Sequence, residues 1–397
     1  GSSRLGSSPP DCSTQLSTAA IRTWMRYRLR LVYLLAGVVA SSGSFSIVVL
    51  PDTQFYTYYA ENSAIFTNQT LWVRDQVAVK DNPRNISFVT HLGDVVNDGF
   101  RYDQWDRANA SMSVLGPPGG PFVVPFSILP GNHDYLATGV KASGNTQYVS
   151  YFGPARFSGA SWYGGADPSG RNSFQFFSGS GMEFLHIALE WQPNDNTPER
   201  NPSPLEWAAA VLRAYPSMPV VLSTHEYLKD FPPGRSRAGE AVFNSFVRTN
   251  DQIFMVLCGH FHLSEPGFGK ANNTDGEWHQ VSTNDFGRQV VEVLSDYQDW
   301  PNGGDGWLRI ITFDLEAGLL RFETYSPTLD RFQTESIEED GQRASNFTIS
   351  LDLKSRFSLR ELGTLSRFGQ GRGHLMNAQA GGQRQYSVNS NGVSSMF

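Results

Sequence analysis

Residues 86–98 read Ile-Ser-Phe-Val-Thr-His-Leu-Gly-Asp-Val-Val-Asn-Asp. The apolar, β-branched run at 86–90 predicts a buried strand, and Asp94 follows it after a short turn that contains Gly93. In open α/β sheets, ligands gather at the carboxyl ends of the strands. This stretch therefore predicts a strand that delivers a carboxylate to a site at one edge of a sheet.

Four other segments share this design, in which an apolar run ends and polar residues follow at once. They are Val-Leu-Pro-Asp-Thr-Gln at 49–54, Leu-Pro-Gly-Asn-His-Asp at 129–134, Ser-Thr-His-Glu at 223–226 and Cys-Gly-His-Phe-His at 258–262. The five segments supply carboxylates, amides and imidazoles: Asp52, Asp94, Gln54, Asn132, His133, His225, His260 and His262. Imidazole suits Zn, Fe, Mn or Co, and carboxylate and amide oxygens suit Mn, Mg or Fe. The set predicts a site for two divalent metal ions.

The rest of the chain alternates short apolar runs with helical stretches, which is typical of an α/β protein. We expect strands at 46–50, 86–90, 126–129, 173–177, 183–189, 220–223, 253–257, 289–294, 307–313 and 319–325. We expect helices at 61–79, 103–115, 204–214 and 238–248. The strands from 289 onward follow one another closely, which favours antiparallel pairing.

The composition excludes several classes of protein. Of the 397 residues 40% are hydrophobic and 13% aromatic, which excludes global disorder. The net charge of −7 argues against stable nucleic-acid binding through bulk positive charge, although it leaves a local basic groove open. The chain has two cysteines, Cys12 and Cys258, which excludes a disulfide scaffold and a cysteine-based zinc module.

The first forty residues are expected to lie outside the fold. Basic residues around 26–30, an apolar run at 31–40 and the small residues after it predict a signal peptide at 25–40. Residues 1–24 are then an upstream or non-native segment. A signal anchor and an ordinary buried segment are the alternatives. A membrane span running on to residue 50 conflicts with the serine–glycine stretch at 41–44 and with the strand expected at 46–50.

Secretion also fits the sequons for N-glycosylation at Asn68, Asn85, Asn109, Asn272 and Asn346. We expect no membrane span in the mature chain. The main domain is expected at 41–352, and the Gly-, Ser-, Gln- and Arg-rich segment at 353–397 is expected to be a disordered tail, with a short ordered cap as the alternative.

In this order, the blocks D-x-Q, G-D-x-x-N, G-N-H-D, a distant His and G-H-x-H resemble those of the calcineurin-like metallophosphoesterases. They run from Asp52 to His262, about half of the chain. The D-T-Q form of the first block, with Asp-Tyr-Gln at 296–298 and Gly-Trp-Leu-Arg at 306–309, resembles a secreted or bacterial-like branch of that family. The resemblance implies a hydrolase acting on phosphoric esters, and a four-layer sandwich of two mixed β-sheets flanked by helices.

The resemblance also implies a role for each residue. Asp94 would bridge two metal ions. One site would be completed by Asp52, Gln54 and His262, and the other by Asn132, His225 and His260. A pair of such ions lowers the pKa of a bound water and neutralises charge on phosphoryl oxygens. His133 would bind no metal, and would protonate the leaving oxygen or hold the phosphoryl group.

Three positions depart from the commonest family pattern. Gln54 stands where many members have histidine, and the consequence is either looser metal binding at the first site or a preference for Mn or Fe over Zn. Asn97 stands where some phosphatases have an aspartate that orients the general-acid histidine, and where purple acid phosphatases have a tyrosine ligand. Asp98 stands where serine/threonine phosphatases have an arginine. Because a carboxylate there repels a dianionic monoester, we expect a phosphodiester or small organic phosphate as substrate.

The alternatives are a non-catalytic secreted or surface binding protein that retains the fold, and a secreted nuclease. Loss of metal from the purified protein would favour the first. Cleavage of single-stranded DNA with a steep salt dependence would favour the second. His91 and His186 are interpreted as structural histidines, because both lie within apolar strands. Glu226 is either a neighbour of the site or a solvated loop acid.

Overall fold

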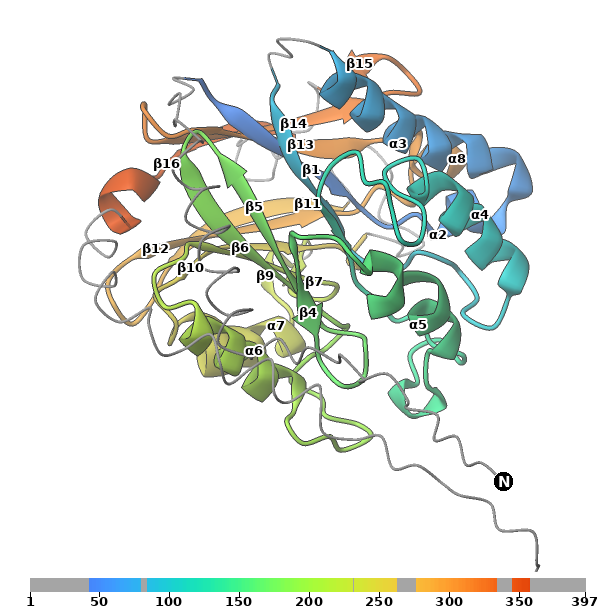
Figure 1. Cartoon of the computed structure of the whole chain (residues 1–397), viewed down its shortest axis with the longest axis horizontal. Coiled ribbons are helices and arrows are strands. Elements are labelled where there is room, and N and C mark those ends of the chain that lie inside the picture. The colour runs from blue at the N-terminus through green and yellow to red at the C-terminus, as the bar shows by residue number, and fades with distance from the viewer. Residues whose placement is uncertain (1–42, 80–83, 231, 263–275, 334–344, 358–397) are drawn as a thin grey trace, which may run out of the picture. The chain divides into compact units, whose positions relative to one another are not determined.

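The computed structural model describes residues 43–79, 84–230, 232–262, 276–333 and 345–357. Two large sheets form the centre of this part of the chain (Figure 1). The first has the order β15-β14-β13-β1-β2-β3, with β16 also paired to β14. Its strands are β1 (Phe45–Leu50), β2 (Ile86–His91), β3 (Phe126–Ile128), β13 (Leu308–Asp314), β14 (Leu319–Ser326), β15 (Arg331–Phe332) and β16 (Asn346–Ser350).

The second sheet has the order β11-β12-β10-β7-β6-β5-β4. Its strands are β4 (Tyr163–Ala166), β5 (Ser173–Gly179), β6 (Met182–Leu189), β7 (Val220–Thr224), β10 (Ile253–Cys258), β11 (Glu277–Thr283) and β12 (Gln289–Ser295). A small hairpin pairs β8 (Leu228–Lys229) with β9 (Gly234–Arg235). Both large sheets are mixed. In the first, the parallel strands β1, β2 and β3 form one end, and in the second, the parallel strands β6, β7, β10 and β12 are flanked by antiparallel pairs.

Helices cover the outer faces of the two sheets (Figure 1). The first sheet carries α2 (Gln54–Tyr58), α3 (Ser63–Ala78), α4 (Tyr102–Met112), α5 (Thr146–Phe152) and α8 (Pro301–Gly304), with short 3-10 turns at Ala60–Asn62, Lys141–Ser143 and Pro154–Phe157. The second carries α6 (Pro204–Ala214) and α7 (Arg237–Val242), which continues as a π-helical turn at Phe243–Val247. Among the described residues, no helix combines the length and the apolar character that a bilayer crossing needs.

The main hydrophobic core lies between the two sheets. Phe45 of β1 and Phe313 of β13 stack with ring centroids 4.7 Å apart, and Phe184 of β6 and Phe254 of β10 pack onto them from the other sheet. Two further clusters bury the outer face of each sheet against its helices. The four layers expected from the sequence are therefore confirmed, and the core fixes the two sheets against each other.

The expected elements correspond closely to the observed ones. Each of the ten expected strands and four expected helices has a counterpart, and α6 begins and ends at the predicted residues. Its start is fixed by a capping box, in which the Ser203 hydroxyl accepts from the Glu206 amide and the Glu206 carboxylate accepts from the Ser203 amide. The short strands β4, β8, β9, β15 and β16 and the longer β11 were not expected.

One expected boundary is wrong for the described residues. The tail was expected to begin at 353, but Leu353 and Phe357 are buried in the core between the sheets. Arg356 is also buried, and its guanidinium donates to the carbonyls of Asp251 and Gln289. The apolar positions 353 and 357 are four residues apart, which is the spacing of one helical face. The leader expected at 25–40 and the tail from 358 onward lie outside the described residues.

Candidate metal centre

The carboxyl ends of parallel strands in both sheets bring the predicted site residues together. Asp52 follows β1, Asp94 follows β2 and Asn132 follows β3 in the first sheet. His225 follows β7 and His260 follows β10 in the second. Because each of these strands ends on the same side of the domain, their loops meet at one place.

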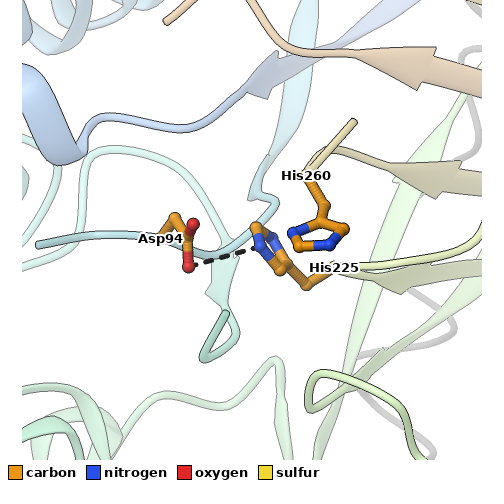
Figure 2. A group of neighbouring side chains, drawn as sticks. All are labelled: Asp94, His225 and His260. Atoms are coloured by element: carbon orange, nitrogen blue, oxygen red, sulfur yellow. Dashed lines mark ion pairs between the residues drawn. The ribbon is translucent and has the colours of Figure 1, made fainter. Parts of the chain in front are cut away.

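Asp94, His225 and His260 form the centre of this group (Figure 2). One ligand atom from each lies within 4.8 Å of the others. His225 Nε2 lies 3.2 Å from Asp94 Oδ1 and 3.0 Å from Asn132 Oδ1. His225 and Asp94 are buried, so this is a charged cluster taken out of water.

The second nitrogen of His225 is fixed by the backbone. Its Nδ1 donates to the Leu92 carbonyl at 2.9 Å, which leaves Nε2 facing Asp94 and Asn132. A histidine held in this way presents Nε2 to a metal ion. Burial by itself lowers the pKa of His225, but the carboxylates of Asp94 and Asp52 raise it to about 10. His260 has the opposite environment: burial and the charge of His225 lower its pKa to about 4.

The remaining predicted ligands are Asp52, Gln54 and His262. Asp52 Oδ1 accepts from the His260 amide at 3.3 Å and lies 3.7 Å from His225 Nδ1. Its second oxygen, Oδ2, is buried without a hydrogen-bond partner, and so is Oε1 of Gln54. His262 donates from Nδ1 to Asp299 Oδ2 at 2.6 Å, which directs Nε2 away from that carboxylate.

The backbone holds the cluster in an unusual conformation. Asp94 and His260 have positive φ angles of 48° and 75°, a region that L-residues seldom adopt. Asp134 accepts hydrogen bonds from the amides of Gly131, Val95 and Val96 at 2.8, 3.2 and 3.1 Å. It thereby ties the loop after β3 to the loop after β2. Strained residues held by surrounding hydrogen bonds are typical of functional sites.

Two glycines leave room for the carboxylates. A Cβ at Gly131 would lie 2.1 Å from Asp94 Oδ1, and a Cβ at Gly259 would lie 2.1 Å from Asp52 Oδ2. Real Cβ atoms do not approach so closely. The glycines of the G-N-H-D and G-H-x-H blocks are therefore required by the packing of the acidic side chains.

His133 is oriented by backbone atoms. Its amide donates to Asp94 Oδ1 at 2.9 Å, and its Nδ1 donates to the carbonyl of Asn97 at 2.8 Å. The side chain of Asn97, which stands where some phosphatases have an orienting aspartate, donates to Asp98 instead. Gln104 fixes this loop, because its Oε1 accepts from the amides of both Asn97 and Asp98.

The structural histidines are as expected. His91 bonds to the Thr53 hydroxyl through Nε2 and accepts from the Gly93 amide through Nδ1. His186 bonds to Gln175 and to Ser223, and burial lowers its pKa to about 3. Both are therefore neutral, satisfied residues.

Glu226 is a buried neighbour of the site. It accepts from Trp191 Nε1 at 3.0 Å and Gln192 Nε2 at 2.6 Å, and lies 3.9 Å from His260 Nε2. The interpretation of Glu226 as a solvated loop acid is therefore excluded.

Sequence reasoning gave no role to the segment 296–299, although it follows β12 directly. Asp296 is fully buried, and burial raises its pKa to about 6. Burial, together with the charge of Asp296, also raises the pKa of Asp52 well above its usual value. Burial lowers the pKa of His262, but Asp296 and Asp299 raise it to about 9. The signal was available, since Asp296 ends an apolar run in the same way as the five recognised segments.

Comparison with known proteins gives the family. The sequence model of the calcineurin-like phosphoesterase family matches residues 45–264. The uncharacterized protein YvnB of Bacillus subtilis (strain 168) is 32% identical over 321 residues, which are 79% of this chain and 22% of that protein. This chain thus spans under a quarter of that relative's length.

Two solved structures resemble the fold more distantly. The calcineurin-like phosphoesterase YfkN from Bacillus subtilis aligns with a TM-score of 0.35 at 10% identity, over 82% of this chain and 98% of that one. The phosphopantetheinyl hydrolase PptH from Mycobacterium tuberculosis aligns with a TM-score of 0.29 at 13% identity, over 64% and 89%. Because the matched segment 45–264 is more than half of the sequence and contains all the predicted metal ligands, the chain belongs to the calcineurin-like phosphoesterase family, whose members hydrolyse phosphoric esters with bound metal.

Proposed function

We propose that this chain is a secreted phosphoesterase that uses two divalent metal ions, Mn, Fe or Zn, to hydrolyse a phosphodiester or a small organic phosphate. The observation that carries the proposal is the pair of buried oxygens without partners, Asp52 Oδ2 and Gln54 Oε1, beside the buried cluster of Asp94, His225 and His260. Buried acceptors are rarely left unpaired in proteins, and a cation satisfies them.

The donor set fits the metal pair in two halves. Asp94 would belong to both halves. The first half would be held by Asp52, Gln54 and His262, and the second by Asn132, His225 and His260. When bound, two such ions supply a nucleophilic water near neutral pH and neutralise charge on the phosphoryl oxygens.

His133 acts as the proton donor to the leaving alcohol in this proposal. Its Nδ1 is occupied by the hydrogen bond to the Asn97 carbonyl, so Nε2 is the nitrogen left to exchange a proton. Its amide is anchored on Asp94, which places it next to the metal ligands without making it one. A backbone carbonyl orients the ring but stabilises an imidazolium less than a carboxylate would.

The charge of Asp98 is the reason for proposing a phosphodiester as the substrate. Its carboxylate accepts from the Gln104 amide at 2.8 Å and from Asn97 at 3.2 Å, and it lies on the same loop as the carbonyl that orients His133. A negative charge at this position repels a dianionic phosphomonoester more than a monoanionic diester. The diester is therefore the favoured substrate.

The decisive experiment combines elemental analysis with hydrolysis on the same sample, purified without chelator. We expect two metal ions per chain, and a higher kcat/KM for bis(p-nitrophenyl) phosphate than for p-nitrophenyl phosphate. His133→Ala should lower kcat strongly for an alkyl leaving group and little for p-nitrophenolate, which needs no proton. His279→Ala, a histidine of β11, is the matched control. Protein without metal or activity after addition of Mn or Zn would instead favour a binding role.

Secretion is tested separately. Residues Asn68, Asn85 and Asn346 are exposed, whereas Asn109 is partly buried and accepts a hydrogen bond from Arg156. We expect mature protein in the medium to begin after residue 40, with glycans on the exposed sequons if the host glycosylates. Protein retained in the cell with residues 25–40 still attached would contradict this.

A further inference from the structure

The loop after β12 places a second pair of unpartnered polar atoms beside the proposed metal centre. Asp296 is fully buried, and Gln298 is buried with a relative exposure of 4%. Asp296 Oδ1 accepts from the Gln298 amide at 3.0 Å, but Asp296 Oδ2 and Gln298 Oε1 have no hydrogen-bond partner. The hydrogen bond within the loop therefore leaves one oxygen of each side chain unsatisfied.

Both side chains belong to a loop that contacts His262, a predicted ligand of the first half of the centre. Gln298 Nε2 contacts Nε2 of His262, the ring nitrogen that Asp299 leaves unoccupied. Asp296 is held beside Gln298 by the hydrogen bond from the Gln298 backbone amide. Four buried oxygens without a hydrogen-bond partner, Asp52 Oδ2, Gln54 Oε1, Asp296 Oδ2 and Gln298 Oε1, thus lie on the segments that follow β1 and β12.

We propose that Asp296 and Gln298 are additional metal ligands of the first half, beyond the residues of the five recognised segments. This inference rests on the proposed two-metal function and deepens it. With them, the first half offers five oxygen donors and one nitrogen, from Asp52, Gln54, Asp94, Asp296, Gln298 and His262. Such an oxygen-rich set of six suits a hard cation such as Mn²⁺ or Mg²⁺, whereas zinc is usually held by four donors that include nitrogen or sulfur.

Asp299 acts as a positioning residue in this arrangement. Its carboxylate accepts from His262 Nδ1 at 2.6 Å, which fixes the ring orientation and makes Nε2 the nitrogen that can face a metal ion. Carboxylates that hold a ligating histidine in this way increase its basicity toward metal. The four-residue segment 296–299 would then supply two ligands and the orientation of a third.

A structural role for Asp296 makes a different prediction from a ligand role. If Asp296 only stabilised the loop, its replacement would destabilise the protein whether or not metal is bound. If it is a ligand, Asp296→Asn removes from the metal-free protein a buried carboxylate with one unpartnered oxygen, and removes a donor from the metal-bound protein. The melting temperature without metal should then stay level or rise, while the increase on adding metal should shrink.

Asp167→Asn is the matched control. Asp167 is also a buried loop aspartate, with a relative exposure of 6%, but both of its oxygens are hydrogen-bonded, to Ser169 and Asn172 among others. Removing its charge should lower the melting temperature without metal and leave metal binding unchanged. Both variants replace a buried aspartate by asparagine, but they should have opposite effects on the melting temperature without metal and on metal binding.

The experiment titrates the chelator-treated full chain with Mn²⁺ by calorimetry and electron paramagnetic resonance, and follows melting with and without Mn²⁺. The wild type should bind two ions. Asp296→Asn should bind one with unchanged affinity and the other at least about tenfold more weakly. Two ions bound by Asp296→Asn with wild-type affinities would overturn this inference alone. A wild type that binds no Mn²⁺ would overturn the two-metal function as well.

Discussion

The two halves of the proposed metal centre differ in whether their buried polar atoms already have hydrogen-bond partners within the protein. In the half built on His225, each ring nitrogen already has a protein partner, the Leu92 carbonyl on one side and Asn132 and Asp94 on the other. In the half built on Asp52, buried oxygens of Asp52 and Gln54 have no partner. The first arrangement is balanced by the proton on His225, and the second is an excess of acceptors.

This difference indicates how each half would respond to metal. The His225 half is held in place by hydrogen bonds and can keep its geometry when no cation is bound, but a cation has to displace a proton there. In the Asp52 half, a cation has to displace the proton of His262, whose pKa is raised to about 9, but it would also relieve the repulsion between the carboxylates of that half. We therefore expect metal affinity to depend on pH in both halves, and the Asp52 half to depend on metal for its order as well.

The largest effect should come from removing the residue that both halves share. Asp94 contacts His225, supports the His133 amide and is the predicted bridge. Asp94→Ala should abolish binding of both ions and lower kcat by at least about a thousandfold, which corresponds to ~4 kcal/mol of lost transition-state stabilisation. Elemental analysis and diester hydrolysis check this. Retention of one full equivalent of metal would show that Asp94 serves one half only.

The next largest effect should come from a variant that removes metal from the Asp52 half and leaves the His225 half occupied. Gly259→Ala places a Cβ 2.1 Å from Asp52 Oδ2, so Asp52 has to move. We expect loss of one ion and a fall in kcat of about a hundredfold, with the His225 half still occupied. Gly139→Ala is the control: nothing lies within 4 Å of its Cβ, and its positive φ of 72° makes it a test of backbone strain alone. Equal metal loss in both variants would contradict the argument.

The sequence predicts many of the residues of the metal centre, but not all of their contacts. Apolar runs followed by polar residues located the strand ends of Asp52, Asp94 and His225, because burial and strand propensity are local properties of the sequence. Which unpaired atoms gather at the site depends on loop conformation and on the packing of two sheets. Hence Asp296 was overlooked, and the Asn97 backbone rather than its side chain proved to orient His133.

The short strands show the same limit. A two-residue strand such as β8 has no periodic pattern of its own and exists because β9 pairs with it. The buried segment 353–357 was assigned to the tail because the composition changes nearby, although Leu353 and Phe357 carry a helical spacing. Composition averages over a window, whereas burial is decided residue by residue.

The pH dependence of the metal-free protein should reveal the proton in the His225 half. The pKa of His225 is raised from 6.5 to about 10, so the protonated form stabilises the folded state below pH 6.5 and this contribution is lost as the pH rises through 10. The difference in melting temperature between wild type and His225→Asn should narrow over that window in chelator. Over the same window, the affinity of the wild type for Mn²⁺ should rise. A constant difference would show that His225 carries no proton there.

The smallest effect should come from changing the donor at position 54. Gln54 begins α2 and is buried, and its Oε1 has no hydrogen-bond partner. An imidazole at position 54 would take the place of this oxygen as a metal donor. Imidazole is a softer donor than an amide oxygen and suits zinc better. Gln54→His should raise the affinity of the Asp52 half for Zn²⁺ relative to Mn²⁺ by about tenfold, because it exchanges one donor among several.

Competition of the two ions at the Asp52 half, measured with the His225 half saturated, tests this preference. Gln69→His is the matched control, since Gln69 is a buried glutamine of α3 that donates to the Trp307 carbonyl. If Gln54→His leaves the Zn²⁺/Mn²⁺ ratio unchanged, residue 54 is not a ligand. The excess of oxygen acceptors in the Asp52 half would then have to be satisfied through Asp52 and the loop after β12.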